Sequence, residues 1–347
     1  MLRFIRSNPV RCGTSGSLQT PNIPPHIFDE LLERLRSLNQ VSIDQVRLVH
    51  SECRESVLNM SCVQLVDSLA ILSSIRLRDR SLGLVGEIFR SLITANKWNN
   101  LSSNDCVRLI TLCGKMRVFD SELFKLMEDR VELASMGDFV RVVNALNRIQ
   151  EFSFFKRSIA NFIACNASSI VHSDVSRVVI PLMRYAVGSS SHDMIPLCLD
   201  AFHTKVESIR SDKDLLVSRS VVSSGDVYII VTLLGKLSRQ LELAGESFSL
   251  TDSASSDIIY CCKSIVSYEL RNWDLERLLR FFFAISKLHV FDDFFVRRRL
   301  VPAISYTFNA KTDKTDEEKE LVKVMIKQLP FRNQMIEDLE TLVSNSN

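Results

Sequence analysis

Apolar residues recur along this chain with the spacing of amphipathic helices. In the segment Asp105–Met116, apolar side chains fall at i, i+1, i+4 and i+7 counted from Leu109, which places them on one face of a helix. The segments Asp138–Ile149 and Asp226–Leu237 repeat this spacing. The pattern therefore predicts helices at all three places.

Six segments of twelve residues align with one another without gaps. Their last residues lie 41, 33, 36, 52 and 51 residues apart, which is the spacing of helix-pair repeats. The six segments are Gln64–Ile75, Asp105–Met116, Asp138–Ile149, Asp174–Tyr185, Asp226–Leu237 and Arg277–Leu288. The β-branched runs VSRVVI and VYIIV would read as strands in isolation, but their alignment with the other copies favours helices.

Each segment is followed by a second apolar stretch, for example Ser121–Leu133 and Phe154–Ala164. A pair of such helices cannot cover its own apolar face, whereas stacked pairs can cover one another. The sequence therefore predicts an all-α protein, an α-solenoid of about six degenerate helix-pair repeats across residues 26–310. Residues 311–347 are predicted to form capping helices at 316–329 and 331–343.

The predicted helices have recognisable starts. The four strongest segments begin with an aspartate, and a carboxylate at the N-cap accepts hydrogen bonds from the free N–H groups of the first turn. The aspartates predicted to cap their helices are Asp105, Asp138, Asp174 and Asp226.

Composition narrows the classes of function. Only 10 glycines and 8 prolines occur in 347 residues, which argues against a β-sandwich and against glycine-rich phosphate loops. The nine cysteines lack the paired spacing of a disulfide framework or a zinc site, so free thiols are expected. No apolar run reaches the length of a membrane span. We find no catalytic motif, so the expectation is no enzyme, no catalytic residue, no metal, no cofactor and no small-molecule substrate.

The first 25 residues have the composition of a mitochondrial presequence. They carry Arg3, Arg6 and Arg11 together with several serines and threonines, and no acidic residue precedes Asp29. A secretory signal would need a continuous apolar core, which this segment lacks. The expected location is the mitochondrial matrix.

Basic residues recur at two places in the aligned segments, seven residues apart. Residues at i and i+7 share a helix face, so stacked repeats would align these side chains into two basic rows. Such rows suit a phosphate backbone, because each neutralised phosphate releases counterions. The first row is Arg108, Arg141, Arg177 and Arg280, and the second is Lys115, Arg148, Arg184, Lys236 and Lys287. The competing interpretation is ordinary exposed charge, since cations near helix C-termini also complement the helix dipole.

Other candidates have plainer explanations. The run Arg297–Arg299 either contacts phosphate or forms a solvated helix face. The run Phe281–Phe283 is expected in the core, and Trp98 and Trp273 are expected to pack at repeat junctions rather than to stack on RNA.

The stretch DCVRLITLCGKMRVFD at Asp105–Asp120 resembles the degenerate helical repeats of mitochondrial RNA-processing proteins. Similar repeats precede the RAP domain in FAST-kinase-like and apicomplexan organellar proteins, and occur in subunits of the kinetoplastid RNA-editing substrate-binding complex. The resemblance covers roughly residues 40–310 and implies RNA binding or ribonucleoprotein scaffolding. The chain departs from the RAP proteins because no C-terminal RAP-like α/β segment is present.

Together these features predict a non-catalytic mitochondrial helical-repeat protein. Its expected partners are RNA, either mitochondrial rRNA or mRNA, and the other proteins of an RNA-processing or mitoribosomal complex. The alternative is a protein-binding scaffold or structural subunit of a mitochondrial assembly without direct RNA contact. The net charge of only +2 favours that alternative.

Overall fold

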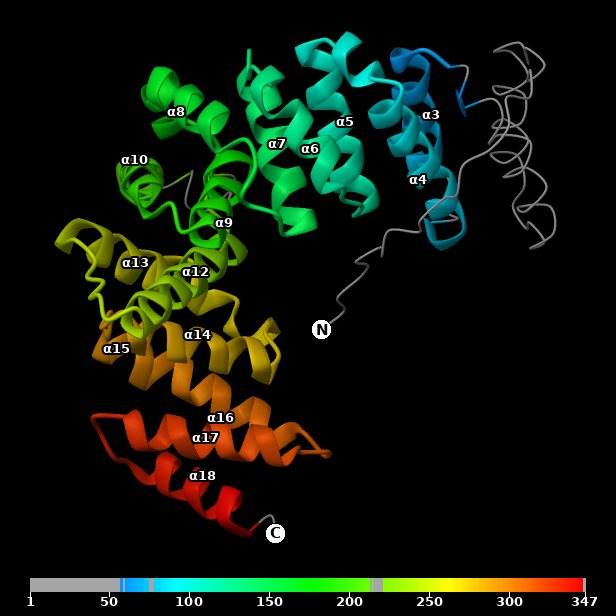
Figure 1. Ribbon diagram of the computed structural model, residues 1–347. Helices are drawn as coiled ribbons and strands as arrows, with labels where there is room; N and C mark the ends of the chain where they lie inside the picture. The colour runs from blue at the N-terminus through cyan, green and yellow to red at the C-terminus, as the bar shows by residue number, and fades with distance from the viewer. Residues whose placement is uncertain (1–56, 59, 75–77, 213, 215–220, 346–347) are drawn as a thin grey trace. The chain divides into compact units, whose positions relative to one another are not determined.

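The computed structural model describes residues 57–345, except 59, 75–77, 213 and 215–220. It is all-helical, with no strand among the described residues, which confirms the predicted all-α class (Figure 1). The chain divides into two compact units, Met1–Leu101 and Ser102–Asn347. The predicted presequence, residues 1–25, and the start of the predicted solenoid lie outside the described residues.

The first unit contains the weakest repeat copy. Its helices are α3 (Cys62–Ser74), α4 (Arg78–Thr94) and the 3₁₀ turn η1 (Lys97–Asn100). Helix α3 packs on α4, and Leu65, Leu69, Ile88 and Leu92 are buried in this unit. The predicted helix at Gln64–Ile75 is therefore present as far as Ser74, and Ile75 lies outside the described residues.

The second unit holds two layers of helices. The first layer is α5 (Ser103–Met116), α7 (Met136–Ile149), α9 (Ile180–Ser189), α12 (Ser224–Leu243), α14 (Leu275–Lys287) and α17 (Asp316–Gln328). The second layer is α6 (Ser121–Met127), α8 (Lys156–Val171), α10 (Ile195–Ser211), α13 (Asp252–Ser264), α16 (Val301–Ala310) and α18 (Gln334–Asn345).

Short turns connect these helices. They are η2 (Glu128–Arg130), η3 (Val175–Val179), η4 (His192–Met194), η5 (Val266–Tyr268), η6 (Leu270–Asn272), α15 (Asp293–Phe295) and η7 (Val296–Leu300). Each first-layer helix contacts the next one in the layer, and α9, α12, α14 and α17 each contact the second-layer helix that follows (Figure 1). This order of contacts is consistent with the predicted solenoid.

The predicted N-caps are right at one helix and wrong at three. Asp174 does cap η3, since its carboxylate accepts a hydrogen bond from the backbone N–H of Arg177. The N-caps of α5, α7 and α12 lie three residues before these aspartates, at Ser102, Ser135 and Ser223. The aspartate then stands at the third helical position, and in α5 and α12 it completes a capping box with the serine.

Two π-helical turns precede prolines. The turn η3 comes just before Pro181, and η7 comes just before Pro302. Proline lacks an N–H and its ring clashes with the carbonyl four residues earlier, so the preceding turn widens. The segment Asp174–Tyr185 is therefore helical as predicted, but its helix is not uniform.

The second helices differ from their predicted bounds. Helix α6 ends at Met127 and is followed by η2, whereas the prediction extended to Leu133. Helix α8 begins and ends later than predicted. The two closing helices, α17 and α18, are present within residues 311–347, and Phe281 and Phe282 are buried as predicted.

Candidate nucleic-acid interface

The nine residues of the predicted basic rows lie on first-layer helices, except Arg177, which lies on the turn η3 just before α9. We number the aligned twelve-residue segments from position 1, so that the first row is position 4 and the second row is position 11. In α7, for example, Val142, Val143 and Leu146 are buried, whereas Arg141 and Arg148 are exposed. All nine are exposed except Lys287, which is half-buried.

The first-layer helices pack in a constant register. A Cβ atom added to Gly114 would lie 2.4 Å from the Cα of Ala145, so α5 and α7 approach very closely. A Cβ added to Gly235 would lie 3.1 Å from the Cα of Ala284. The side-chain amide of Asn147 donates to the carbonyl of Pro181 at 2.8 Å. In all three contacts, position 10 of one segment meets position 8 of the next.

A second set of contacts keeps the same offset. The hydroxyl of Ser176 donates to the carboxylate of Asp226 at 2.7 Å, and the guanidinium carbon of Arg277 lies 4.6 Å from the centre of the Tyr228 ring. Here position 3 of one segment meets position 1 of the next. Since packed helices are about 8–10 Å apart, equivalent exposed positions on neighbouring helices lie side by side.

Some cations of the two rows are already paired. Arg141 contacts Asp138 at 3.3 Å, Arg280 pairs with Glu276, and Lys287 pairs with Glu242. Four others have no acidic partner among the residues that the structure describes, and this uncompensated group consists of Arg148, Arg177, Arg184 and Lys236. It lies on α7, η3, α9 and α12, in the middle of the first layer.

The structure also adds cations that the sequence analysis did not select. Arg239 is exposed on α12, one turn beyond Lys236, and this spacing was visible in the sequence. Arg277 stands where most copies carry aspartate. Its aromatic neighbour Tyr228 belongs to the preceding repeat, so no local pattern could reveal that contact. Ile229 interrupts the first row on α12 and is half-buried.

The remaining candidates from the sequence are the tryptophan at a repeat junction and the run of three arginines, and the structure treats them differently. Trp273 is buried and packs against Tyr228 and Phe281, as its predicted packing role requires. Within the triple-arginine run, Arg297 pairs with Asp293 and lies over the ring of Phe331. Arg298 and Arg299 are exposed on η7, which leads into the second layer.

One group of histidine and carboxylate side chains converges in the described part of the chain, between α10 and α13. Its ligand-type atoms, from His203, Glu207 and Asp257, lie within 4.8 Å of one another. The His203 ring contacts the buried Asp257 carboxylate at 2.7 Å, and the Arg210 guanidinium contacts both Glu207 and Asp257. The Arg210 guanidinium therefore already occupies the place that a bound metal ion would take. Ion pairing between α10 and α13 explains the cluster.

Burial is the largest cause of the pKa shifts of the buried aspartate and cysteines. It raises the pKa of the Asp257 carboxyl, although His203 and Arg210 both act to lower that pKa. Burial also raises the pKa of Cys106 to about 11 and that of Cys198 to about 12. These thiols are free and protonated near neutral pH, and a protonated thiol is a poor nucleophile.

Comparison with known proteins adds no assignment. No protein family matches the chain, and none of the curated proteins is significantly similar to it. The resemblance to mitochondrial RNA-processing repeats stays a prediction. Over the described residues, no helix is both long and apolar enough to cross a membrane.

Proposed function

We propose that this protein is a non-catalytic helical-repeat protein that binds RNA along the exposed face of its first helix layer. One observation carries the proposal. The uncompensated group, Arg148, Arg177, Arg184 and Lys236, stands on consecutive helices that share one packing register. Within the described part of the chain these charges have no acidic partner, so they are available to a polyanion.

The chemistry of the surface favours a phosphate backbone over individual bases. Guanidinium groups bind phosphate oxygens through two parallel hydrogen bonds, and each neutralised phosphate releases condensed counterions. Neighbouring cations are spaced by one helix diameter across the layer, and the two rows are about 10 Å apart along α7 and along η3–α9. An extended strand can therefore cross several repeats.

The presequence-like N-terminus places this activity, in our proposal, in a ribonucleoprotein complex of the mitochondrial matrix.

The test is a filter-binding titration of the full chain with an oligouridine at several salt concentrations. Replacement of the uncompensated group, Arg148, Arg177, Arg184 and Lys236, by glutamine should reduce the slope of log K against log salt by about 3, since each phosphate contact on a single strand contributes about 0.7. The affinity at low salt should fall in parallel.

A matched control changes the same amount of charge elsewhere. Lys156 and Arg157 begin α8, and Arg298 and Arg299 lie on η7, and all four are exposed. Their replacement by glutamine should leave the slope close to that of the unmodified protein. Equal losses in both variants, or no binding by the unmodified chain, would contradict RNA binding through the first layer.

A second candidate function is a protein-binding scaffold, and one observation favours it. Glu276 and Glu242 neutralise Arg280 and Lys287, so charge on the α12–α14 part of the surface is mixed. A scaffold would co-purify with partner proteins after ribonuclease treatment and would show no salt-dependent binding of oligouridine. An RNA-binding protein of the proposed kind would lose partners that depend on RNA.

A further inference from the structure

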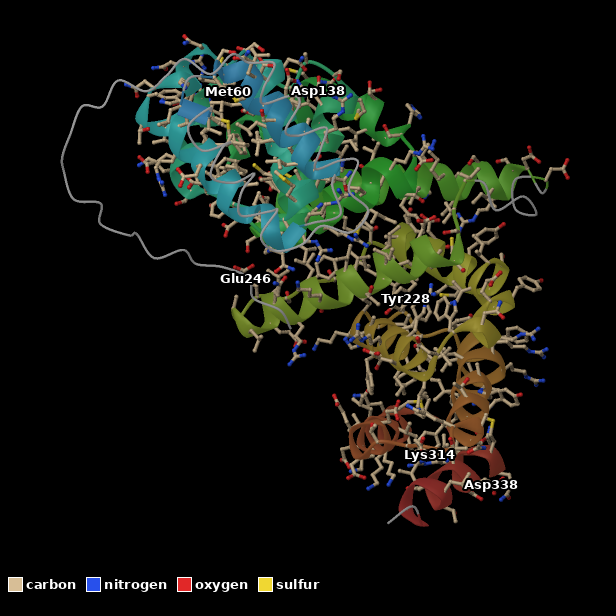
Figure 2. The ribbon with its side chains drawn as sticks, turned by 90° about the vertical axis from the view of Figure 1, so that its right-hand side faces the viewer. Met60, Asp138, Tyr228, Glu246, Lys314 and Asp338 are labelled. Atoms are coloured by element: carbon tan, nitrogen blue, oxygen red, sulfur yellow. The ribbon has the colours of Figure 1, made fainter. Side chains whose placement is uncertain are left out.

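Arg277 is held between two aromatic side chains at the start of α14. Its guanidinium carbon lies 4.6 Å from the centre of the Tyr228 ring and 4.1 Å from the centre of the Trp273 ring. The two rings are 5.4 Å apart and inclined by 75°, so they form a corner around the guanidinium (Figure 2 locates Tyr228 on α12). Cation–π contacts of this kind fix a guanidinium in place.

The hydrogen-bonding capacity of this guanidinium is unused among the residues that the structure describes. Its Nε is buried and has no hydrogen-bond partner, and no acidic residue in the described chain pairs with Arg277. No acceptor for the terminal nitrogens is found among the described residues, and the residue as a whole is half-buried. An arginine that is fixed by its rings and has open donors is prepared for an external acceptor.

The acids closest to Arg277 in sequence, and the acid at position 1 of the preceding segment, are engaged elsewhere. The Asp226 carboxylate accepts hydrogen bonds from Ser176 and Ser223. Asp274 accepts the backbone N–H of Arg277 as the N-cap of α14, and Glu276 pairs with Arg280. None of them supplies the missing counter-ion.

The position of Arg277 coincides with the interruption of the first basic row. That row has no cation on α12, where Ile229 takes position 4. Arg277 reaches back from α14 over Tyr228, the residue just before Ile229. It also precedes Arg280 by three residues, and side chains at i and i+3 are neighbours on a helix. Arg277 therefore supplies positive charge at the place where the row lacks it.

We propose that Arg277, positioned by Tyr228 and Trp273, binds a backbone phosphate of the RNA on α12 and α14. This inference rests on the proposed function, because the phosphate belongs to the strand that follows the basic rows. The planar fork of the guanidinium matches two phosphate oxygens, and its fixed position reduces the ordering cost of binding.

The experiment uses Trp273 as the reporter. The chain has only two tryptophans, so a Trp98→Phe background of the full chain leaves Trp273 as its one tryptophan, which is excited selectively at wavelengths that tyrosine does not absorb. Oligouridine should change the Trp273 emission on binding, because the phosphate binds next to the cation that touches the indole ring. Arg277→Gln should abolish this change and lower the salt slope by about 0.7.

Two further variants make the result specific. Arg277→Lys keeps the charge and should retain most of the salt slope while losing affinity, because lysine cannot form the two parallel bonds. Arg271 is exposed on η6, two residues from Trp273, and Arg271→Gln should leave both the emission change and the slope intact. Circular dichroism of each variant verifies that it is folded.

The outcomes separate this inference from the proposed function. If Arg277→Gln changes neither readout while the four-residue variant still lowers the slope, the Arg277 contact is wrong and RNA binding stands. Equal effects of Arg271→Gln and Arg277→Gln also overturn the contact. A strong preference for guanosine-containing oligonucleotides that disappears in Arg277→Gln would replace the phosphate by a base. Absence of any binding by the unmodified chain overturns both proposals.

Discussion

The two helix layers of the second unit use their polar and charged side chains differently. Between first-layer helices the closest backbone approach is between small residues, as where Gly114 meets Ala145, and the ion pair of Lys287 with Glu242 lies at the edge of the α12–α14 contact. Between the second-layer helices α10 and α13 the contact is an ion-pair cluster around the buried Asp257. Charge in the second layer joins helices, whereas the uncompensated group in the first layer joins nothing in the described chain.

The difference distinguishes cations that are paired within the fold from cations that could bind a ligand. Lys263 pairs with Asp292 and Arg297 pairs with Asp293, so these second-layer cations have partners within the fold. Surface pairs contribute little to stability, typically about 0–1 kcal/mol, but they occupy the cation. Cations without an acidic partner among the described residues also occur outside the first layer, for example Arg298 on η7, which lies outside the aligned segments.

The largest effect on stability should come from the close contact that fixes the register. Gly114→Ala would place a methyl group 2.4 Å from the Cα of Ala145, so α5 and α7 would have to separate. We expect a loss of about 1–3 kcal/mol in the free energy of unfolding, which is the usual cost of overpacking. Urea unfolding followed by circular dichroism measures it.

The matched control for that substitution is Gly86→Ala. Gly86 is exposed within α4, and an added Cβ would meet nothing within 4 Å. Alanine there should stabilise the protein by about 0.5–1 kcal/mol, because glycine is a poor helix former. A stabilising effect of Gly114→Ala would mean that the first layer is not closely packed, and the constant register would lose its basis.

A smaller effect is expected from the pH dependence of the second-layer cluster. Since burial raises the pKa of Asp257 above 3.8, the folded state keeps this proton where the unfolded chain has lost it. The free energy of unfolding should therefore fall as pH rises from 3.8 through the raised pKa, and should level off above it. Asparagine does not ionise, so Asp257→Asn removes this titration. The wild type should therefore lose stability relative to the variant across that window.

Urea unfolding of both proteins over the acid range, at constant ionic strength, provides the measurement. The pairwise comparison cancels the titration of the other carboxyl groups. A wild-type protein that gains stability relative to Asp257→Asn with rising pH would show that His203 and Arg210 outweigh burial. The second layer would then be held by its ion pairs more strongly than described above.

Helical periodicity gave the first-layer helices because it depends only on neighbouring residues. The true N-caps were also readable, since Ser102 and Asp105 have the spacing of a capping box. The pairing of Arg141 with Asp138 and of Arg280 with Glu276 is likewise local, within one helical turn. These features could be predicted from the sequence alone.

Contacts between repeats could not be predicted in this way. Glu242 pairs with Lys287 across 45 residues, and only the packing of α12 on α14 brings them together. The corner formed by Tyr228 and Trp273 around Arg277 has the same origin. The helical periodicity of the sequence was enough to predict the surface on which the cations lie. Tertiary packing decides which of these cations are paired with acidic side chains.

The most direct test of RNA binding by the first layer is to map crosslinks between the full chain and an oligonucleotide that contains 4-thiouridine. Irradiation followed by mass spectrometry identifies the crosslinked peptides. If RNA follows the first layer, crosslinks should appear in peptides from α7, η3–α9, α12 and the start of α14. Crosslinks concentrated in the second-layer helices α8, α10 and α13, with none in the first layer, would contradict RNA binding by the first layer.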